Sequence, residues 1–320
     1  MKQFDFVGRK KLFAAISIGI ILVGVVFNII FGTQLDIEFK GGTLLQYSYE
    51  NEIDENTLKD FVAGQLSGAE CQTINNDISN TNIVSVSLTE NIDLDAQEAF
   101  QTALSERFPD NNIDLYNANS LSPSSGRMFF IKCLVAIALA SVFLVIYVAL
   151  RFRKIGGLSA GVMALLALFN DLLVSYFIFV VFRIPLDDNF VAVVLSILGY
   201  SLNGTIVIYD RIRENRRIMD KKTPIAEIVN TSINQSFVRT LNTAICTFTA
   251  IAVVAVLALA TSMDSIVSFA VPMMFGVLSG FYTSTCLASP LWVAWVEHKE
   301  KRDAEKAAAA KGSKSYKKKA

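Results

Sequence analysis

Histidine, cysteine and charge are scarce in this sequence of 320 residues. It has one histidine, His298, four cysteines, and no glycine-rich loop that ends in Gly-Lys-Ser or Gly-Lys-Thr. The histidine lies in a polar C-terminal tail, which argues against histidine-based triads and zinc sites, and without the loop we expect no nucleotide hydrolysis. The sequence therefore predicts no enzyme, no cofactor and no metal site, and leaves an ion gradient or a partner as the energy source.

Charged residues make up 18% of the chain, whereas ordinary soluble domains carry roughly 25%. Hydrophobic residues make up 52%, and the 29 basic residues balance the 29 acidic ones, which argues against a nucleic-acid partner. The charge is unevenly spread, because residues 33–126 hold only 3 basic but 16 acidic residues. An acidic segment between basic and apolar ones indicates a membrane protein with an external domain.

Six apolar segments are long enough to cross a bilayer, which takes roughly 20 helical residues. Lipid cannot satisfy backbone hydrogen bonds, so each segment is predicted to be a helix. The first has a basic leader, as a signal peptide has, but its apolar core exceeds the roughly 7–15 residues of a signal peptide and favours an uncleaved anchor. The segments are Leu12–Phe31, Met128–Leu150, Leu158–Phe182, Phe190–Tyr209, Thr240–Ala260 and Ile266–Pro290.

Basic residues indicate the orientation of these spans. Lys and Arg gather before the first span, after the second, after the fourth and in the tail after the sixth. Positive charge in short loops marks the cytoplasmic side, so both termini are predicted to be cytoplasmic. The expected parts are an N-terminus with the first helix (1–32), an external domain (33–127), five further helices (128–296) and a cytosolic Lys-rich tail (297–320). We expect the tail to be disordered and solvated, with contact to anionic lipid or RNA as the alternative.

The external segment is predicted to be a small α+β domain. Alternating apolar residues indicate strands, and apolar residues at helical spacing indicate two helices. The resulting order β-α-β-β-α-β is typical of a ferredoxin-like unit. Only Cys71 lies outside the spans, so no internal disulfide is expected. The predicted elements are strands near 45–49, 71–74, 83–88 and 113–116 and helices over 54–66 and 95–108.

Asp171 is the most informative residue, because it lies about fourteen residues into the third span. A carboxylate at mid-bilayer costs roughly 2.5–3.5 kcal/mol and usually marks an ion or substrate path. The alternative is a structural aspartate paired inside the bundle. Asn203 in the fourth span and Arg239 at the start of the fifth are the other candidates for an ion relay, although small polar residues also serve close helix packing and Arg239 can extend to water.

Four stretches of this sequence resemble the SecF family, membrane subunits of bacterial protein export related to the RND transporters. Residues 36–43 (Asp-Ile-Glu-Phe-Lys-Gly-Gly-Thr) are similar to the motif that opens the family's external domain. Residues 146–152 look like the end of its second span, and residues 232–236 with 239–243 like the start of its fifth. Its fourth-span signature resembles residues 199–203 and Tyr209, continued by Asp210, Arg211, Ile212, Arg213, Glu214 and Asn215.

The resemblance covers about residues 5–296 and implies the function. Family members have a six-helix bundle, pair with SecD, dock on the SecYEG channel in the bacterial cytoplasmic membrane, and use a proton or sodium gradient to move external domains that hold emerging preproteins. The motif of Asp36, Phe39, Gly41 and Gly42 is then interpreted as a hinge of the external domain. A simple turn into the first strand is the alternative.

Two positions depart from the family pattern. Gly204 stands where the family has the aspartate that is thought to take up protons, and Asn170 precedes Asp171 where relatives often have histidine. Asp171 could substitute, SecD could supply the coupling carboxylates, or the chain could be a non-conducting structural partner of SecD. An RND-like exporter of lipids or small molecules is a further alternative, which the single small external domain disfavours.

Overall fold

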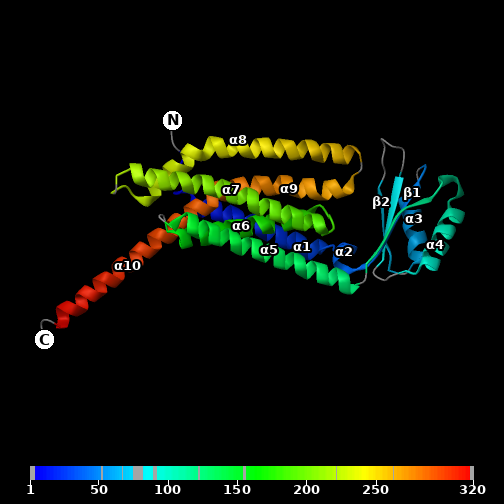
Figure 1. Ribbon diagram of the computed structural model, residues 1–320, viewed down its shortest axis with the longest axis horizontal. Helices are drawn as coiled ribbons and strands as arrows, with labels where there is room; N and C mark the ends of the chain where they lie inside the picture. The colour runs from blue at the N-terminus through cyan, green and yellow to red at the C-terminus, as the bar shows by residue number, and fades with distance from the viewer. Residues whose placement is uncertain are drawn as a thin grey trace.

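The computed structural model describes residues 4–51, 53–66, 68–74, 82–88, 92–121, 123–153, 156–220, 222–261 and 263–317. Within these residues, six helices are long and apolar enough to cross a membrane, and they form a bundle with an α/β domain at one end (Figure 1). The predicted fold class, a mainly α-helical membrane protein, is confirmed. The bundle contains α1 (Lys10–Phe31), α5 (Pro123–Arg151), α6 (Gly157–Val181), α7 (Asp188–Ile218), α8 (Ile225–Ala260), α9 (Asp264–Tyr282), the π-helical segment η3 (Thr283–Ala288) and α10 (Ser289–Lys317).

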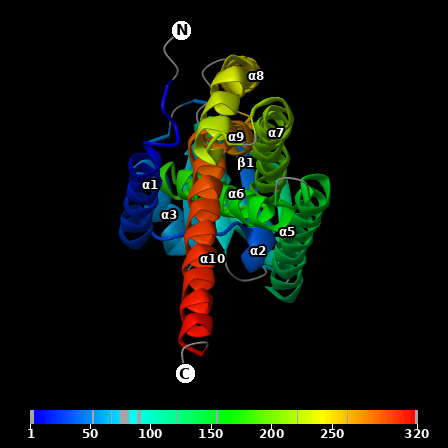
Figure 2. The ribbon, with the colours of Figure 1, turned by 90° about the vertical axis from the view of Figure 1, so that its left-hand side faces the viewer.

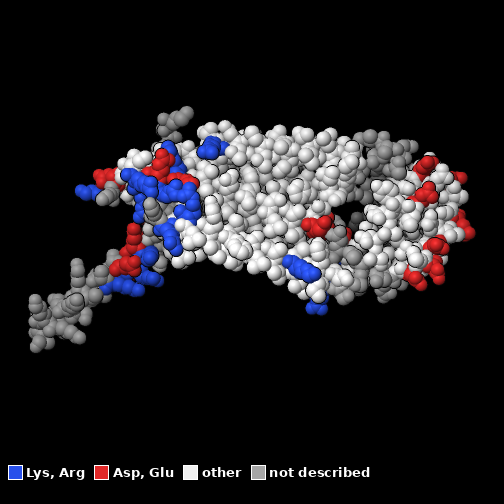
Figure 3. Space-filling model, in the orientation of Figure 1, with Lys and Arg blue, Asp and Glu red and all other residues white. Residues whose placement is uncertain are grey.

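Charge divides the molecule along its length. In the view of Figure 3, Lys and Arg gather at the end of the bundle far from the α/β domain, while the charged residues seen on the far side of the domain are Asp and Glu. We call the first of these the basic end, which comprises the start of α1, the end of α5, the end of α7 and the loop to α8. Its basic residues include Arg9, Lys10, Arg151, Arg153, Arg211, Arg213, Arg216, Arg217 and Lys222.

All six predicted spans are helices, but several extend further than the apolar pattern indicated. The fourth was predicted to end at Tyr209, whereas α7 continues to Ile218, and α8 begins fifteen residues before the predicted Thr240. Ion pairs one turn apart support the polar part of α7, because Arg213 contacts Asp210 at 2.8 Å and Arg211 contacts Glu214 at 2.6 Å.

The sixth span and the tail differ from the prediction. The span divides into α9, η3 and α10, and α10 projects from the basic end as a continuous helix to Lys317 (Figures 1 and 2). A disordered tail is therefore wrong for residues 297–317. This segment is rich in Ala, Lys and Glu, which are strong helix formers, and it contains no proline.

The α/β domain, for which we keep the name external domain from its predicted position, has the predicted ferredoxin-like topology. Its described strands form one antiparallel sheet in the order β2-β3-β1-β4, and two helices cover one face. Asp54 caps the first of these helices by accepting a hydrogen bond from the Thr57 backbone N–H at 2.9 Å. The elements are β1 (Gly42–Tyr49), α3 (Glu55–Gln65), β2 (Glu70–Ile74), β3 (Asn82–Leu88), α4 (Leu94–Arg107), η1 (Pro109–Asn111) and β4 (Asp114–Leu121).

The core of this domain lies between the sheet and the two helices. Tyr47 of β1 is fully buried against Phe100 of α4, with ring centroids 5.8 Å apart. Burial raises the pKa of the Tyr47 phenol to about 12, and its hydroxyl has no hydrogen-bond partner among the described residues. The other buried residues of this core are Leu45, Tyr49, Leu58, Val62, Val84, Val86, Leu88, Leu104 and Ile113.

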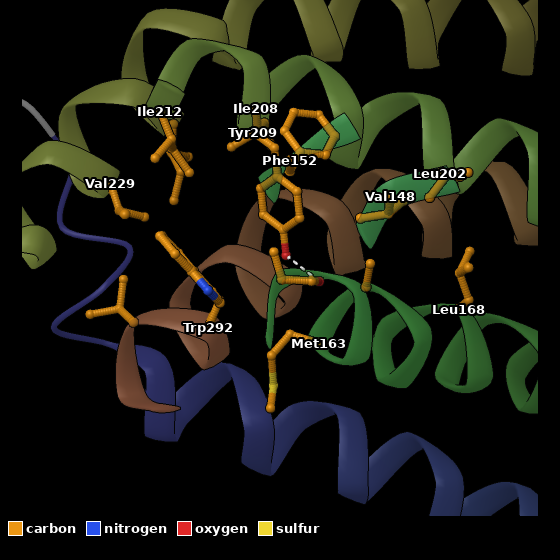
Figure 4. Packing of buried hydrophobic residues seen from close by; sticks show 14 of the residues in the cluster. Val148, Phe152, Met163, Leu168, Leu202, Ile208, Tyr209, Ile212, Val229 and Trp292 are labelled. Carbon is orange, nitrogen blue, oxygen red and sulfur yellow. Dashed lines mark hydrogen bonds between the residues drawn. The ribbon is translucent and has the colours of Figure 1, made fainter. Parts of the chain in front are cut away.

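A second core joins the bundle helices near the basic end (Figure 4). Trp292 at the start of α10 packs on Tyr209 of α7, with ring centroids 6.2 Å apart, and Tyr209 packs edge-on against Phe152. The polar atoms of these rings are satisfied, because the Tyr209 hydroxyl donates to the Ala160 carbonyl at 3.2 Å and the Trp292 indole donates to Ser159 at 3.1 Å. This end of the bundle is thus fixed around a ring cluster.

Gly157 of α6 lies directly against the backbone of α5, so its substitution tests the packing between these two helices. A Cβ at Gly157 would lie 2.2 Å from the backbone oxygen of Ala149, and backbone cannot move aside as a flexible side chain can. We expect Gly157→Ala to destabilise the protein by about 1–3 kcal/mol, measured by thermal unfolding of the purified protein in detergent. Gly199→Ala is the matched control, because a Cβ added there would meet no side chain or neighbouring helix within 4 Å, and alanine favours helices. Equal melting temperatures for the two variants would contradict this account.

Candidate functional site

Asp171 lies near the middle of α6 and is surrounded by hydroxyl groups from neighbouring helices. Its side chain is 1% exposed. The Ser201 hydroxyl of α7 donates to Asp171 Oδ2 at 2.6 Å, and the Ser279 hydroxyl of α9 donates to Oδ1 at 2.5 Å. The Thr283 hydroxyl of η3 donates to Oδ2 at 2.8 Å. We call Asp171, Ser201, Ser279 and Thr283 the carboxylate cluster.

Close approach of the helices makes this cluster possible. A Cβ at Gly280 of α9 would lie 3.0 Å from the Cβ of Ser201, so only glycine fits comfortably between α9 and α7 at this level. Gly276, one turn earlier, similarly faces Ile197 of α7. Small residues let helices in a membrane approach and hydrogen-bond, and here they bring the hydroxyls of α7 and α9 within reach of α6.

The cluster links the charge of one carboxyl group to the packing of three helices. An ionised carboxylate only accepts hydrogen bonds, so it suits three hydroxyl donors. A proton on one oxygen adds a donor, and one hydroxyl must then turn away or reverse its bond. A cation placed beside the carboxylate would compete with the same hydroxyls. Within the described residues, no group of three His, Cys, Asp or Glu side chains could hold a metal ion.

Asn203 and Arg239, the other relay candidates, lie together in a pocket whose described lining does not include Asp171. Both are exposed, and both line a pocket of about 100 Å³ between α7, α8 and α9. Gly204 also lines this pocket, where its Cβ would meet the Ser284 hydroxyl at 2.8 Å. Asn203 is two residues from Ser201, about 200° around the helix, so the two side chains leave α7 on nearly opposite sides.

Ser201, Ser279 and Thr283 were not singled out from the sequence as partners of Asp171. Asn203, which the sequence did single out, lies on the exposed side of α7, whereas Ser201 lies among apolar neighbours on the buried face. A usable signal was present, because Ser279 and Thr283 are four residues apart on the same span. Two hydroxyls one turn apart in an apolar helix indicate a common polar partner.

The signature after the fourth span connects α7 to its neighbours. Asp210 contacts Arg151 of α5 at 3.2 Å as well as Arg213, and Arg211 pairs with Glu214. Asn215 donates to Ser232 and to Gln235 of α8, each at 2.8 Å. These contacts hold the basic ends of α5, α7 and α8 together.

The predicted hinge motif joins the bundle to the external domain. Asp36 precedes α2 (Ile37–Lys40), and the buried ring of Phe39 packs between Phe129 and Phe130 of α5, at centroid distances of 5.7 and 5.2 Å. Gly41 and Gly42 then have φ angles of 78° and 131°, which favour glycine. The motif therefore combines an anchored aromatic ring with a glycine pair at the start of β1.

The loop between α6 and α7 contacts the segment that joins α1 to α2 (residues 32–36), which we call the linker. The Leu186 N–H donates to the Gln34 carbonyl at 2.9 Å, and the Asp36 N–H donates to the Leu186 carbonyl at 3.0 Å, which makes a parallel bridge between Leu35 and Leu186. Next to it, Asp187 caps α7 and accepts a hydrogen bond from Ser268 of α9 at 3.2 Å. Burial raises the pKa of the Asp187 carboxyl above its ordinary value.

Comparisons with known proteins agree on one family. A family model described as protein export membrane protein SecD/SecF, C-terminal, matches residues 100–298. The protein translocase subunit SecF of Petrotoga mobilis is 30% identical, over 94% of this chain and 99% of its own. The protein translocase subunit SecDF of Bacillus subtilis is 28% identical over 94% of this chain, which spans 39% of that longer protein. The crystal structure of SecDF from Thermus thermophilus, described as a translocon-associated membrane protein, has the same fold, with a TM-score of 0.78 and 24% identity over 92% of this chain and 39% of its own.

The hydroxyl donors of the carboxylate cluster are expected to stabilise the folded protein. Ser279→Ala removes a donor to a buried carboxylate, and we expect a loss of about 1.5–3 kcal/mol in the free energy of unfolding. Ser196→Ala, on the exposed side of α7, is the matched control and should change little. Asp171→Asn should reduce the cost of Ser279→Ala, because the two residues interact directly. Additive effects in this double-mutant cycle, followed by thermal unfolding in detergent, would show that the hydroxyl does not act through Asp171.

Proposed function

Because the chain belongs to the SecD/SecF family of protein export membrane proteins, we propose that it is a SecF-type subunit of the protein translocase in which Asp171 couples an ion gradient to movement of the external domain. The observation that carries this proposal is the carboxylate cluster, a single buried acid tied to three helices of the bundle. Intramembrane carboxyl groups of this kind usually lie on ion paths.

The proposed partners follow from the relatives. In Bacillus subtilis a SecDF protein contains a region similar to this chain within a longer polypeptide, so we propose that a separate SecD subunit completes the assembly here. Docking on SecYEG and contact of the external domain with the translocating preprotein are parts of the same proposal. The basic end would then lie in the cytoplasm, with both termini, and the acidic domain on the outer face of the bacterial cytoplasmic membrane.

A continuous path of contacts leads from Asp171 to the external domain. Asp171 is on α6 and Ser201 on α7, and the loop between these two helices carries Leu186. Leu186 bonds on both sides to the linker, through Gln34 and Asp36. A change at the carboxylate that shifts α6 against α7 would move this loop, and with it the start of the external domain.

The proton or sodium ion is proposed to act by weakening the carboxylate cluster. When the ion binds, the hydroxyls of Ser201, Ser279 and Thr283 lose a shared acceptor, and α7 and α9 are less firmly held to α6. When it leaves, the ionised carboxylate draws them together again. Asn203 and Arg239 take no direct part in this step, because they line a separate pocket on another side of α7.

The second candidate, a structural partner of SecD that conducts no ion, is favoured by Gly204. The pocket beside Arg239 holds no carboxylate among its described lining residues, so the aspartate that the family pattern has at the position of Gly204 is missing from it. In that case the carboxylate cluster would serve stability alone, and any coupling would depend on SecD.

Export kinetics distinguish an ion-coupled subunit from a structural partner that conducts no ion. In cells whose only copy carries Asp171→Asn, we expect a pulse-labelled secreted precursor to accumulate as it does in the deletion strain, while the variant still inserts and assembles. Asp303→Asn, an exposed acid on α10, is the matched control and should process precursor at the wild-type rate. Separate collapse of the proton and the sodium gradient identifies the ion. Wild-type export by Asp171→Asn would support the structural partner, and an unaffected deletion strain would remove the translocase role.

A further inference from the structure

A groove of about 580 Å³ lies between α7 and α8 at the basic end, and its charges are unbalanced. Its charged lining consists of four arginines and two acids, namely Asp210, Arg211, Arg213, Glu214, Arg217 and Arg239. We propose that this groove binds the phosphate of an anionic phospholipid. This site does not depend on the proposed export function.

The two acids of the groove are already engaged. Asp210 contacts Arg213 at 2.8 Å and Arg151 at 3.2 Å, and Glu214 contacts Arg211 at 2.6 Å. Among the residues that the structure describes, neither Arg217 nor Arg239 has an ion-pair partner. The groove thus presents two guanidinium groups whose charge is not compensated within this chain.

Because position 204 is glycine, it places no carboxylate beside Arg239. Arg239 borders the groove on one side and the pocket of about 100 Å³ on the other, and Gly204 contributes no side chain to that pocket. The neighbouring polar groups of this pocket, Asn203, Thr243 and Ser284, supply hydroxyl and amide groups but no negative charge. An exposed arginine at this level, with no acid beside it in the pocket, attracts an anionic ligand.

The surroundings match a lipid. The groove lies where the apolar spans end, at the level of lipid headgroups. Apolar side chains next to it are exposed, with Ile218 73% and Val238 64% accessible, and can contact acyl chains. Guanidinium groups match phosphate oxygens with paired hydrogen bonds, and basic pockets between membrane helices on one side of the bilayer bind anionic headgroups.

The test measures lipid binding to the full chain purified in a neutral detergent. Phosphatidylglycerol is titrated in, and bound lipid is counted by native mass spectrometry. We expect Arg217→Gln combined with Arg239→Gln to weaken binding about tenfold or more, and phosphatidylcholine to bind the unaltered protein at least about tenfold more weakly than phosphatidylglycerol. The matched control is Arg216→Gln combined with Lys222→Gln, which removes the same charge from the basic end outside the groove.

Two further variants keep the result interpretable. Arg217→Lys combined with Arg239→Lys retains the charge and should bind more tightly than the glutamine pair if it folds equally well. Gly204→Asp leaves every arginine in place but puts a carboxylate in the pocket beside Arg239, and should weaken lipid binding severalfold. Thermal unfolding of each variant in detergent reports whether the bundle is intact.

Three outcomes would overturn the proposal. Equal loss in the control pair would mean that the whole basic end attracts lipid without a defined site. Unchanged binding in the glutamine pair would place the lipid elsewhere. Displacement of phosphatidylglycerol by millimolar inorganic phosphate would mean that the groove selects a free anion, not a lipid. Loss of lipid binding with intact export would still support the site, since the two functions are separate.

Discussion

A carboxyl group buried in an apolar bundle must be hydrogen-bonded, and much of this structure follows from that need at Asp171. Burial of an unpaired charge costs several kcal/mol, whereas three hydroxyl donors compensate much of that cost. To bring donors from α7 and α9 to α6, the helices must pack closely. This requirement explains the glycine at position 280, where α9 meets Ser201 of α7. The π-helical turn that begins at Thr283 belongs to the same arrangement, because π segments often occur where a helix adjusts its register at a functional site.

The same constraint connects the interior of the bundle to the end that carries the α/β domain. α6 and α7 share the carboxylate cluster, and the loop between them is hydrogen-bonded to the linker of the external domain. The opposite end is held differently, by ion pairs and by the ring cluster of Trp292 and Tyr209. One end of the bundle is therefore fixed by large rings and paired charges, while the other is connected through backbone hydrogen bonds to a separately folded domain.

The sequence allowed prediction of every feature that rests on a repeated pattern. Long apolar runs gave the six spans, and alternating residues gave the order of the external domain, because burial acts on many residues at once. Asp171 was found because one charge in an apolar run is conspicuous. Its partners were not, because serine is common in membrane helices and only three-dimensional packing shows that Ser201 faces α6 while Asn203 faces the pocket beside Arg239. The helical tail was missed because its many charges suggested disorder, although Ala, Glu and Lys also favour helix.

The two connections of the external domain differ in backbone conformation. The chain enters the domain through Gly41 and Gly42, whose positive φ angles favour glycine. It leaves the domain where β4 ends at Leu121 and α5 begins at Pro123. β1 and β4 are adjacent in the sheet, so the two connections lie side by side. In the proposed movement, the domain would rotate about the start of α5, and the glycine pair would be the more flexible of its two connections. A small displacement of the linker near that axis would then become a larger movement of α3 and α4, which lie on the side of the domain far from the bundle (Figure 1).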